Sequence, residues 1–527
     1  MTLRFRAFRA LVLLVGFFLL GFALLAAMAL CDWLLVTHLS SARAAWFAGG
    51  VLVLTGLSAL VILRGMVTFL RVGRLGPVPE AVRVGPDDHP ALWEYVRAAA
   101  EAVGERPPDE LYLTAEMNAG VSEQSRLLGL LPGRRRMFVG LPLLAGLTGP
   151  RLRALLAHEF GHFGHLDTRL CGVVMRGRAA VLHTEWMFGE GSTWLHRAIG
   201  GFYARYARVF LRTSQSVARH QEFAADAVAA RHAGRDATTA LLRSLPDLDA
   251  AWSHYLATYA AMGEPVGALP PAGEVYGGFR HLLAARAGDG LAALSAGRRP
   301  SRPHPYDSHP PTAERVARIE ALPPDGRACG ADDEPGALTL LRDADGAFAA
   351  LEACLLPQAS RRMTWEDLVM ARAVVDAEGW SRPLCVAVGR ALRSTARDAD
   401  RAAAVNEPDD AGLPELEAVL DAFDQGLLWT EIADRVPKPE QAARLTGSSA
   451  RNFVRPRIFD GLAGLVHLRL AATGHAGPDI AWSGVPGLAL PVEWEKGLDD
   501  ALDAAVADTP DTAPLRALLA RVGPVPV

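Results

Sequence analysis

Two long runs without a charged residue lie near the start of this 527-residue chain. The first extends from Ala10 to Leu30 and the second from Ala44 to Leu63, and both are rich in leucine, valine and alanine. Each contains about 20 residues, the length that a helix needs to cross the hydrocarbon core of a bilayer. We therefore predict two N-terminal transmembrane helices, with residues 1–75 as a membrane anchor. The alternative for the first run is a cleaved signal peptide, because Ala27-Met28-Ala29 resembles a cleavage site, but the run is long for that role.

The arginines beside these two runs predict the orientation of the anchor. The segment between the runs contains a single arginine, Arg43, whereas three arginines precede the first run and three follow the second: Arg4, Arg6, Arg9, Arg64, Arg71 and Arg74. Arginine and lysine accumulate on the cytoplasmic side of membrane proteins. We therefore predict a multi-pass protein of the cell (inner) membrane, in contact with the lipid bilayer, with everything after the second run in the cytoplasm.

Length and composition narrow the class of protein. A chain of this length exceeds one ordinary core and predicts two or three domains. The formal net charge of −4 provides no general attraction to nucleic acid, so no nucleic-acid partner is expected. Lys438 and Lys496 are the only lysines, and neither ends a glycine-rich loop, which excludes a Walker A phosphate site. The five cysteines contain no C-x-x-C pair, which argues against a thiolate zinc site.

Beyond the anchor, the pattern predicts a mainly α-helical fold with a small β-sheet. Residues 110–114 and 137–139 are expected to be short strands, and a helix is expected from Thr148, as N-cap, to Asp167. Further helices are expected over 170–185, 195–233 and 236–260. We predict one domain over residues 76–325 and a separate helical accessory domain of unknown role over 335–527.

The residues that indicate chemistry lie in the segment ALLAHEFGHFGHLD, residues 154–167. His158 and His162 are four residues apart, so on a helix their rings point the same way and can bind one zinc ion. Glu159 lies about 100° round the helix from His158, where its carboxylate can accept a proton from a zinc-bound water. An H-E-x-x-H pattern can also arise by chance in a helix. The next ligand of the metzincins is missing, since Thr168 stands where they have a histidine.

A later predicted helix offers the third ligand. Its segment RHQEFAADAVAA contains Glu222 and Asp226, one helical turn apart and flanked by apolar residues. Glu222 can complete a His₂Glu site that leaves the fourth position for water, and Asp226 can orient a ligand histidine. The alternative is an ordinary solvated acidic face, which the apolar neighbours disfavour.

Three motifs in this order, HEFGHFGHLD, EFAAD and SHPPTAERVARI, resemble those of metallopeptidase family 48. This family includes HtpX-like heat-shock proteases and the CAAX prenyl endopeptidases, and the resemblance covers roughly residues 76–322 together with the N-terminal pair of apolar runs. The resemblance implies a gluzincin-type zinc peptidase in which His158, His162 and Glu222 bind one Zn²⁺ per chain and Glu159 is the catalytic base. Asp167 matches the acidic residue that ends the first motif.

The resemblance also implies roles for residues outside the metal ligands. His309 would stabilise the tetrahedral intermediate or donate a proton, and Arg315 would pair with Asp226. The segment Asn118-Ala119-Gly120 matches the edge of the substrate cleft, where a substrate strand could add. From the residues alone, His309 belongs to an ordinary turn and Asn118 to an Asn-Gly-type turn.

We therefore predict a membrane-anchored zinc metalloendopeptidase that acts on protein or peptide substrates in membrane protein quality control or processing. One alternative is a catalytically silent membrane scaffold or regulator with a structural metal site. The chain departs from the family in lacking further apolar runs after the first motif, which makes cleavage of prenylated substrates doubtful. A faint helix-turn-helix pattern near residue 430 leaves DNA binding by the C-terminal region as a second alternative.

Overall fold

The structure is a computed structural model, and it describes most of the chain. The described residues are 3–38, 42–71, 80–123, 133–163, 174, 177–178, 181, 194–286, 289–296, 310–325, 335–357, 361–399, 413–442, 445, 447–495 and 497–522. They form two compact units, Met1–Ser253 with Ala287–Leu356 and His254–Arg286 with Pro357–Val527. The roles that we predicted for the three sequence segments stay predictions.

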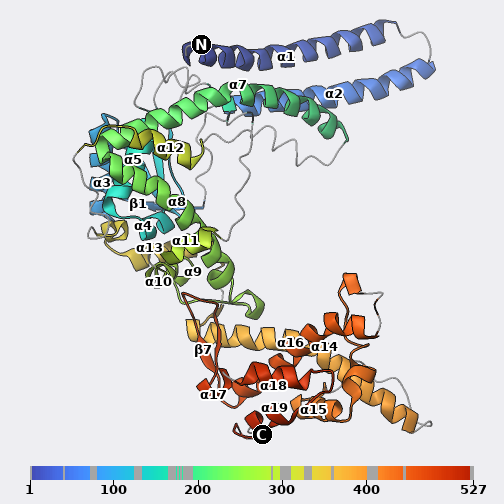
Figure 1. Ribbon diagram of the computed structural model, residues 1–527. Coiled ribbons are helices and arrows are strands. Elements are labelled where there is room, and N and C mark those ends of the chain that lie inside the picture. Colours follow the sequence, from blue (N-terminus) through green and yellow to red (C-terminus); the bar gives the residue numbers. More distant parts are fainter. Residues whose placement is uncertain are drawn as a thin grey trace. The chain divides into compact units, whose positions relative to one another are not determined.

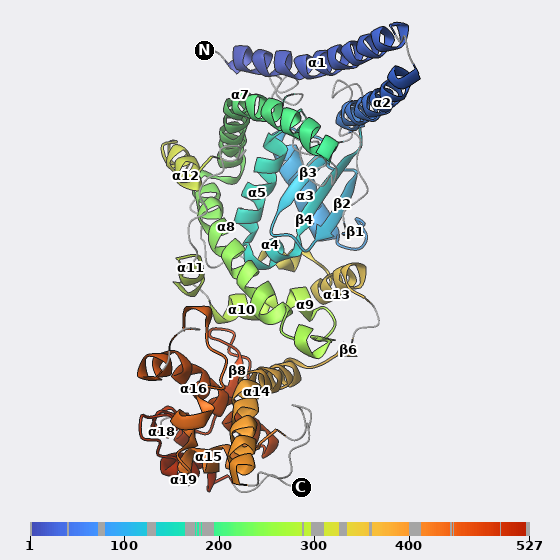
Figure 2. The same cartoon turned by 90° about the vertical axis from the view of Figure 1, so that its right-hand side faces the viewer.

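The two apolar runs lie in two long helices of the first unit. Helix α1 (Leu3–Thr37) packs against α2 (Ala42–Arg71) and against α7, as Figures 1 and 2 show. A polar contact joins the pair, because the Thr55 hydroxyl donates to the Asp32 carboxylate at 2.8 Å. Within the described residues, neither helix nor any other contains a stretch that is both long and apolar enough to cross a bilayer. The helices are confirmed, whereas the prediction of transmembrane spans is not supported.

A four-stranded mixed sheet forms the centre of the first unit. Its order is β1-β2-β4-β3, with β1 (Val82–Val84) antiparallel to β2 (Glu110–Thr114), β2 parallel to β4 (Arg135–Gly140), and β3 (Ala119–Glu123) antiparallel to β4. The sequence correctly predicts β2 and the middle of β4. Strand β3 ends the sheet order, so one of its edges is not paired within this sheet. All five residues of β2 are buried, as expected for a central strand.

Helix α3 (Pro90–Val103) connects β1 to β2. Proline occupies its first turn, and Gly104 follows in the left-handed conformation with φ of 79°, the usual signals for the two ends of a helix. Its buried face includes Leu92, Val96 and Ala100. This face packs against α5 (Gly149–Gly161), which also contacts β3 and α7 (Trp194–Ala233). The packing places α5 beside the edge strand of the sheet.

The remaining elements of the first unit surround this core. The short helix α4 (Leu141–Gly146) follows β4, and the backbone N–H of Ala337, at the start of η4 (Ala337–Leu340), donates to the Leu147 carbonyl. Helix α8 (Arg235–Tyr255) follows α7, and the π-helical turn η2 (Leu256–Ala260), which continues it in the chain, belongs to the second unit. Helices α11 (Asp289–Ala296), α12 (Thr312–Glu320) and α13 (Ala344–Leu355) complete this part.

Thr148 precedes α5, as predicted, but it does not cap the helix. Its side chain makes no capping hydrogen bond, and its hydroxyl is buried without a partner among the described residues. The backbone of Thr148 pairs with Gly336 in an isolated β-bridge. The predicted start of the helix after Thr148 is therefore confirmed, whereas the predicted capping hydrogen bond of its side chain is wrong.

The second unit is mainly helical. Helix α14 (Trp365–Ala399) packs along α16 (Gly447–Ala472), and α15 (Leu416–Asp424), α18 (Leu498–Ala505) and α19 (Ala513–Leu519) share one apolar core with them. Smaller elements are α9 (Glu274–Gly277), α10 (Phe279–Ala285), α17 (Val492–Glu495), η3 (Glu264–Val266), η5 (Leu428–Ile432) and η6 (Glu440–Ala442). Two small sheets were not predicted: β5 (Ala268–Leu269) with β6 (Arg361–Arg362), and the hairpin of β7 (Gly477–Asp479) and β8 (Gly487–Ala489).

Candidate metal centre

Two helices of the first unit approach each other closely where the motif residues lie. A Cβ atom built on Gly161 of α5 would lie 3.1 Å from the Cα atom of Ala225 and 3.2 Å from the Cβ atom of Val228, both in α7. Carbon atoms in ordinary contact are about 3.5–4.0 Å apart, so any larger residue at this position would require α7 to shift by a few tenths of an ångström. Gly161 follows His158 by three residues and Ala225 follows Glu222 by three. The close contact therefore lies about one turn from both groups.

His158 lies in the last turn of α5 and His162 is the C-cap residue of this helix, so the two are adjacent, as their spacing predicts. Their ring centroids are 4.8 Å apart and the rings are nearly perpendicular, at 83°. His158 is buried, and the side chain of His162 retains 27 % exposure. Potential ligand atoms of His158, Glu159 and His162 all lie within 4.8 Å of one another. Glu159 is half-buried, so it can face both this cluster and an incoming molecule.

Glu222 of α7 faces both imidazoles. One of its carboxylate oxygens is 3.7 Å from Nε2 of His158, and the other is 3.7 Å from Nε2 of His162. Ligands on adjacent corners of a zinc tetrahedron are separated by about 3.4 Å, given bonds of about 2.0–2.2 Å. The three side chains therefore fit one metal ion after movements of a few tenths of an ångström. Glu159 also belongs to the cluster, but Glu222 contacts both rings and is more deeply buried, which favours Glu222 as the third ligand.

Asp226 and Arg315 form contacts that orient His158. Asp226 lies one turn after Glu222 and contacts Nδ1 of His158 at 3.0 Å, which leaves Nε2 of that ring directed toward Glu222. A carboxylate on the second ring nitrogen is the usual way to fix a ligand histidine. Arg315 of α12 donates from Nε and Nη2 to the two oxygens of Asp226, at 2.8 and 2.6 Å. The predicted pair of Arg315 with Asp226 is present in the structure.

The charges in this cluster favour a divalent cation. Glu159, Glu222 and Asp226 bring three carboxylates, and Arg315 brings one positive charge, with its Nη1 3.7 Å from Glu222. Burial opposes ionisation of Asp226, but the hydrogen bonds from Arg315 and His158 outweigh it and lower the pKa of Asp226 to about 2. If the two imidazoles are neutral, as metal binding requires, two negative charges remain uncompensated in this set. A divalent cation would neutralise them.

Helix α12 brings Arg315 to the centre, and its motif is described from Pro310 onward. Pro310 and Pro311 precede the helix, and Pro310 is buried. His309, the predicted catalytic histidine, lies outside the described residues. Asp167, the acidic end of the first motif, lies outside them as well.

The predicted cleft-edge residues lie at the start of β3. Asn118 is exposed and directly precedes the strand, Ala119 is buried, and Gly120 has no atom within 4 Å of the position of a Cβ. The backbone N–H of Gly140 donates to the Asn118 carbonyl at 2.9 Å, which joins this segment to the end of β4. The Asn-Gly-type turn is wrong as a description, because Ala119 and Gly120 pair with Val139 and Phe138 in the sheet.

Sequence reasoning missed two contacts that hold the ends of the ligand segments. The guanidinium of Arg135, at the start of β4, lies 4.6 Å from the ring centroid of Phe163, the residue after His162. The guanidinium of Arg318 lies 3.5 Å from the ring centroid of Phe223, the residue after Glu222. Cations over aromatic rings attract them electrostatically. Both pairs join residues far apart in the sequence, so no local pattern indicates them.

Two histidines and two glutamates lie around one point, and an aspartate contacts the second ring nitrogen of one histidine. Catalytic zinc hydrolases use donor sets of this kind. The family comparison agrees with this class. Residues 107–322 match the family model described as Peptidase family M48, which is the family that the three motifs resemble. Among curated proteins and solved structures, none matches the chain.

Proposed function

We propose that the protein hydrolyses peptide bonds with one zinc ion held by His158, His162 and Glu222. The observation that carries this proposal is the position of Glu222, whose two oxygens lie 3.7 Å from Nε2 of each histidine. The family of residues 107–322 supports peptides as the substrate class. When bound there, zinc would supply a Lewis acid for the scissile carbonyl and the attacking water.

The side chains around this position have separate tasks. Glu159 accepts the proton of the attacking water and is placed next to the ligand histidines for it. Asp226 holds His158 through Nδ1, and Arg315 fixes Asp226 through two hydrogen bonds. This support keeps Nε2 of His158 available to the metal. His309 as the donor to the oxyanion is part of the proposal on the strength of the motif resemblance.

The edge of the sheet offers a position for the substrate. Strand β3 ends the sheet order and contacts α5, which contains His158 and ends at the C-cap residue His162. An extended peptide can add to such an edge through main-chain hydrogen bonds. We therefore propose that Asn118, Ala119 and Gly120 bind the substrate backbone. The exposure of Asn118 and the open space above Gly120 support this assignment.

The physiological role that we propose is the cleavage of proteins in quality control or processing, and the location at the cytoplasmic face of the membrane stays a prediction.

The catalytic role is tested with an unstructured fluorogenic peptide library. Wild-type protein should cleave it, 1,10-phenanthroline should abolish cleavage, and added zinc should restore it. The His158→Ala variant should be inactive, whereas Glu320→Gln, at an exposed position of α12, should cleave normally. Absence of cleavage by the zinc-loaded wild-type protein would favour the scaffold alternative. Cleavage that survives phenanthroline and His158→Ala would show that the activity does not come from this metal site, and either result would refute the proposal.

A further inference from the structure

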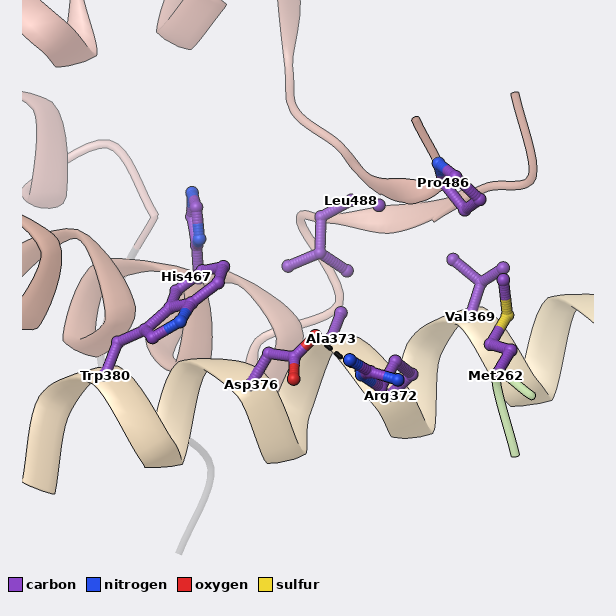
Figure 3. Close-up of a pocket in the computed structure, with 10 residues that line it drawn as sticks. Met262, Val369, Arg372, Ala373, Asp376, Trp380, His467, Pro486 and Leu488 are labelled. Carbon is purple, nitrogen blue, oxygen red and sulfur yellow. Dashed lines mark hydrogen bonds and ion pairs between the residues drawn. The ribbon is translucent and has the colours of Figure 1, made fainter. Parts of the chain in front are cut away.

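The second unit contains a trough along one face of helix α14. The helix lines it with residues spaced at helical intervals from Val369 to Trp380, and the other walls come from Met262, from His467 of α16 and from the start of β8. Figure 3 shows these side chains facing one another across the trough. The enclosed space is about 160 Å³. A cavity of about 150 Å³ holds one benzene molecule, so this space fits one branched aliphatic or aromatic side chain.

The two ends of the trough differ in character. One end is aliphatic and consists of Met262, Val369, Pro486 and Leu488. At the other end, Trp380 lies beside His467 and is 51 % exposed. Val369 and Trp380 are eleven positions apart, which corresponds to about 16 Å of helix. This length exceeds one amino acid and matches an extended peptide of about four or five residues.

The middle of the trough is polar and rich in hydrogen-bond donors. Arg372 donates from Nε to Asp376 at 2.7 Å, and this contact orients the guanidinium. Among the described residues, the two Nη groups of Arg372, the indole N–H of Trp380 and the ring nitrogens of His467 have no hydrogen-bond partner. Burial lowers the pKa of His467, so its ring is neutral at pH 7 and offers one further N–H. A group with several acceptors, such as a carboxylate, complements these donors.

The trough is held in place by its surroundings. A Cβ atom on Gly464 of α16 would lie 2.6 Å from the Ala377 carbonyl of α14, so the two helices touch there, and His467 follows one turn later. The loop before β8 is fixed by Tyr259, whose hydroxyl donates to the Ala481 carbonyl at 2.8 Å, and by Arg286, which donates to the Trp482 and Gly484 carbonyls. Ala481 adopts a φ of 44°, a conformation that non-glycine residues rarely adopt unless their surroundings impose it. These contacts make the walls preorganised.

We propose that this trough binds the C-terminus of a polypeptide whose last residue is apolar, with that side chain among Val369, Met262 and Leu488 and its carboxylate on Arg372. The preceding residue then lies against Trp380. The size of the space selects the apolar side chain, the donors select the carboxylate, and the length of the trough selects a peptide over a single amino acid. Binding of this kind goes beyond the proposed peptidase function, because it requires no catalysis.

The test measures fluorescence anisotropy of a labelled hexapeptide, Ser-Gly-Ser-Gly-Phe-Leu, with the full chain carrying Glu159→Gln to prevent cleavage. The free acid should bind, whereas the same peptide with a C-terminal amide, or with a terminal aspartate, should bind at least tenfold more weakly. Arg372→Gln should weaken binding of the free acid about tenfold. This is the lower end of the range expected when a hydrogen bond to a charged group is lost, because the side chain of Arg372 is partly exposed.

A matched pair of glycine variants locates the site. Gly487 lines the trough and Gly477 does not, both belong to the β7–β8 hairpin, and neither has an atom within 4 Å of the position of a Cβ. Gly487→Val should fill the trough and abolish binding, whereas Gly477→Val should bind like the parent. Equal binding by the two valine variants would overturn the proposal, and so would equal binding of acid and amide. If N-acetylleucine competed for the site and bound as tightly as the hexapeptide, the occupant would be a small apolar carboxylate. That result would contradict a polypeptide as the occupant.

Discussion

Replacement of Gly161 by alanine should separate metal affinity from stability. The added Cβ would lie 3.1 and 3.2 Å from atoms of α7, about half an ångström inside ordinary contact. Helices α5 and α7 must therefore move apart by a similar distance, one turn from His158 and Glu222. The two 3.7 Å separations between Glu222 and the histidines would grow, although a tetrahedral site needs about 3.4 Å.

Two effects on stability oppose each other in this variant. Overpacking of a tight contact costs about 1–3 kcal/mol, and replacement of a helical glycine by alanine returns up to about 1 kcal/mol. We expect a net loss of about 1 kcal/mol in the free energy of unfolding. Zinc affinity should fall more visibly, by roughly tenfold to a hundredfold, the size of effect seen when the support of a metal ligand is disturbed.

The assay is competition for zinc with a chromophoric chelator, beside unfolding in urea. Gly379→Ala is the matched control, because Gly379 lies within α14 and nothing lies within 4 Å of its Cβ position. The control should gain about 0.5–1 kcal/mol of stability and bind zinc normally. Unchanged zinc affinity in Gly161→Ala would show that the close approach of α5 and α7 does not position the ligands.

Two further predictions concern the first unit. Arg315→Met leaves Asp226 buried with only His158 as a partner, so it should lower the free energy of unfolding by about 3 kcal/mol and should also lower zinc affinity. In the control, Arg243→Met removes the exposed Arg243–Glu320 pair and should cost less than about 1 kcal/mol. Equal effects of the two variants in urea unfolding would contradict the role of Arg315. Burial of His89, partly opposed by Asp88 and Asp343, lowers its pKa below the ordinary 6.5, and its Nδ1 accepts the backbone N–H of Arg342 at 3.2 Å. The folded state favours the neutral ring, so the contribution of this hydrogen bond to stability, about 1 kcal/mol, is complete above pH 6.5 and is lost as the pH falls through the lowered pKa of His89. His89→Asn should therefore lose less stability than the wild type between pH 7 and 5. Identical pH profiles of the two proteins would refute this role of His89.

Local patterns in the sequence predict much of the metal centre. The four-residue spacing of His158 and His162 places both on one face of a helix, and the same periodicity pairs Glu222 with Asp226. That these two helices meet depends on Gly161, whose significance lies in a contact with Ala225 some sixty positions away. No periodicity reveals such a contact. The pair of Arg315 with Asp226 followed from the motif resemblance and not from spacing.

The less successful predictions have physical reasons. Strand β3 is only five residues long and contains a glycine, so it lacks the apolar alternation by which strands are predicted, and its pairing with β4 decides its structure. The β7–β8 hairpin contains a proline and glycines and is held by Tyr259 and Arg286, which are distant in sequence. Phe453 retains 41 % exposure, whereas Trp494 of the same unit is buried. Apolar character alone does not decide which face of a helix is covered.

The central claim is that His158, His162 and Glu222 bind the metal and that Glu159 is the base, and zinc content measured beside peptide hydrolysis tests it most directly. Wild-type protein should contain about one zinc per chain, from the single His₂Glu donor set. Glu159→Gln should retain the zinc and lose at least about 10²-fold in rate, because only general-base assistance is removed. Glu222→Gln should lose zinc itself, since a neutral amide is a poorer ligand than a carboxylate. Hydrolysis by Glu159→Gln near the wild-type rate, or full zinc content in Glu222→Gln, would contradict the account.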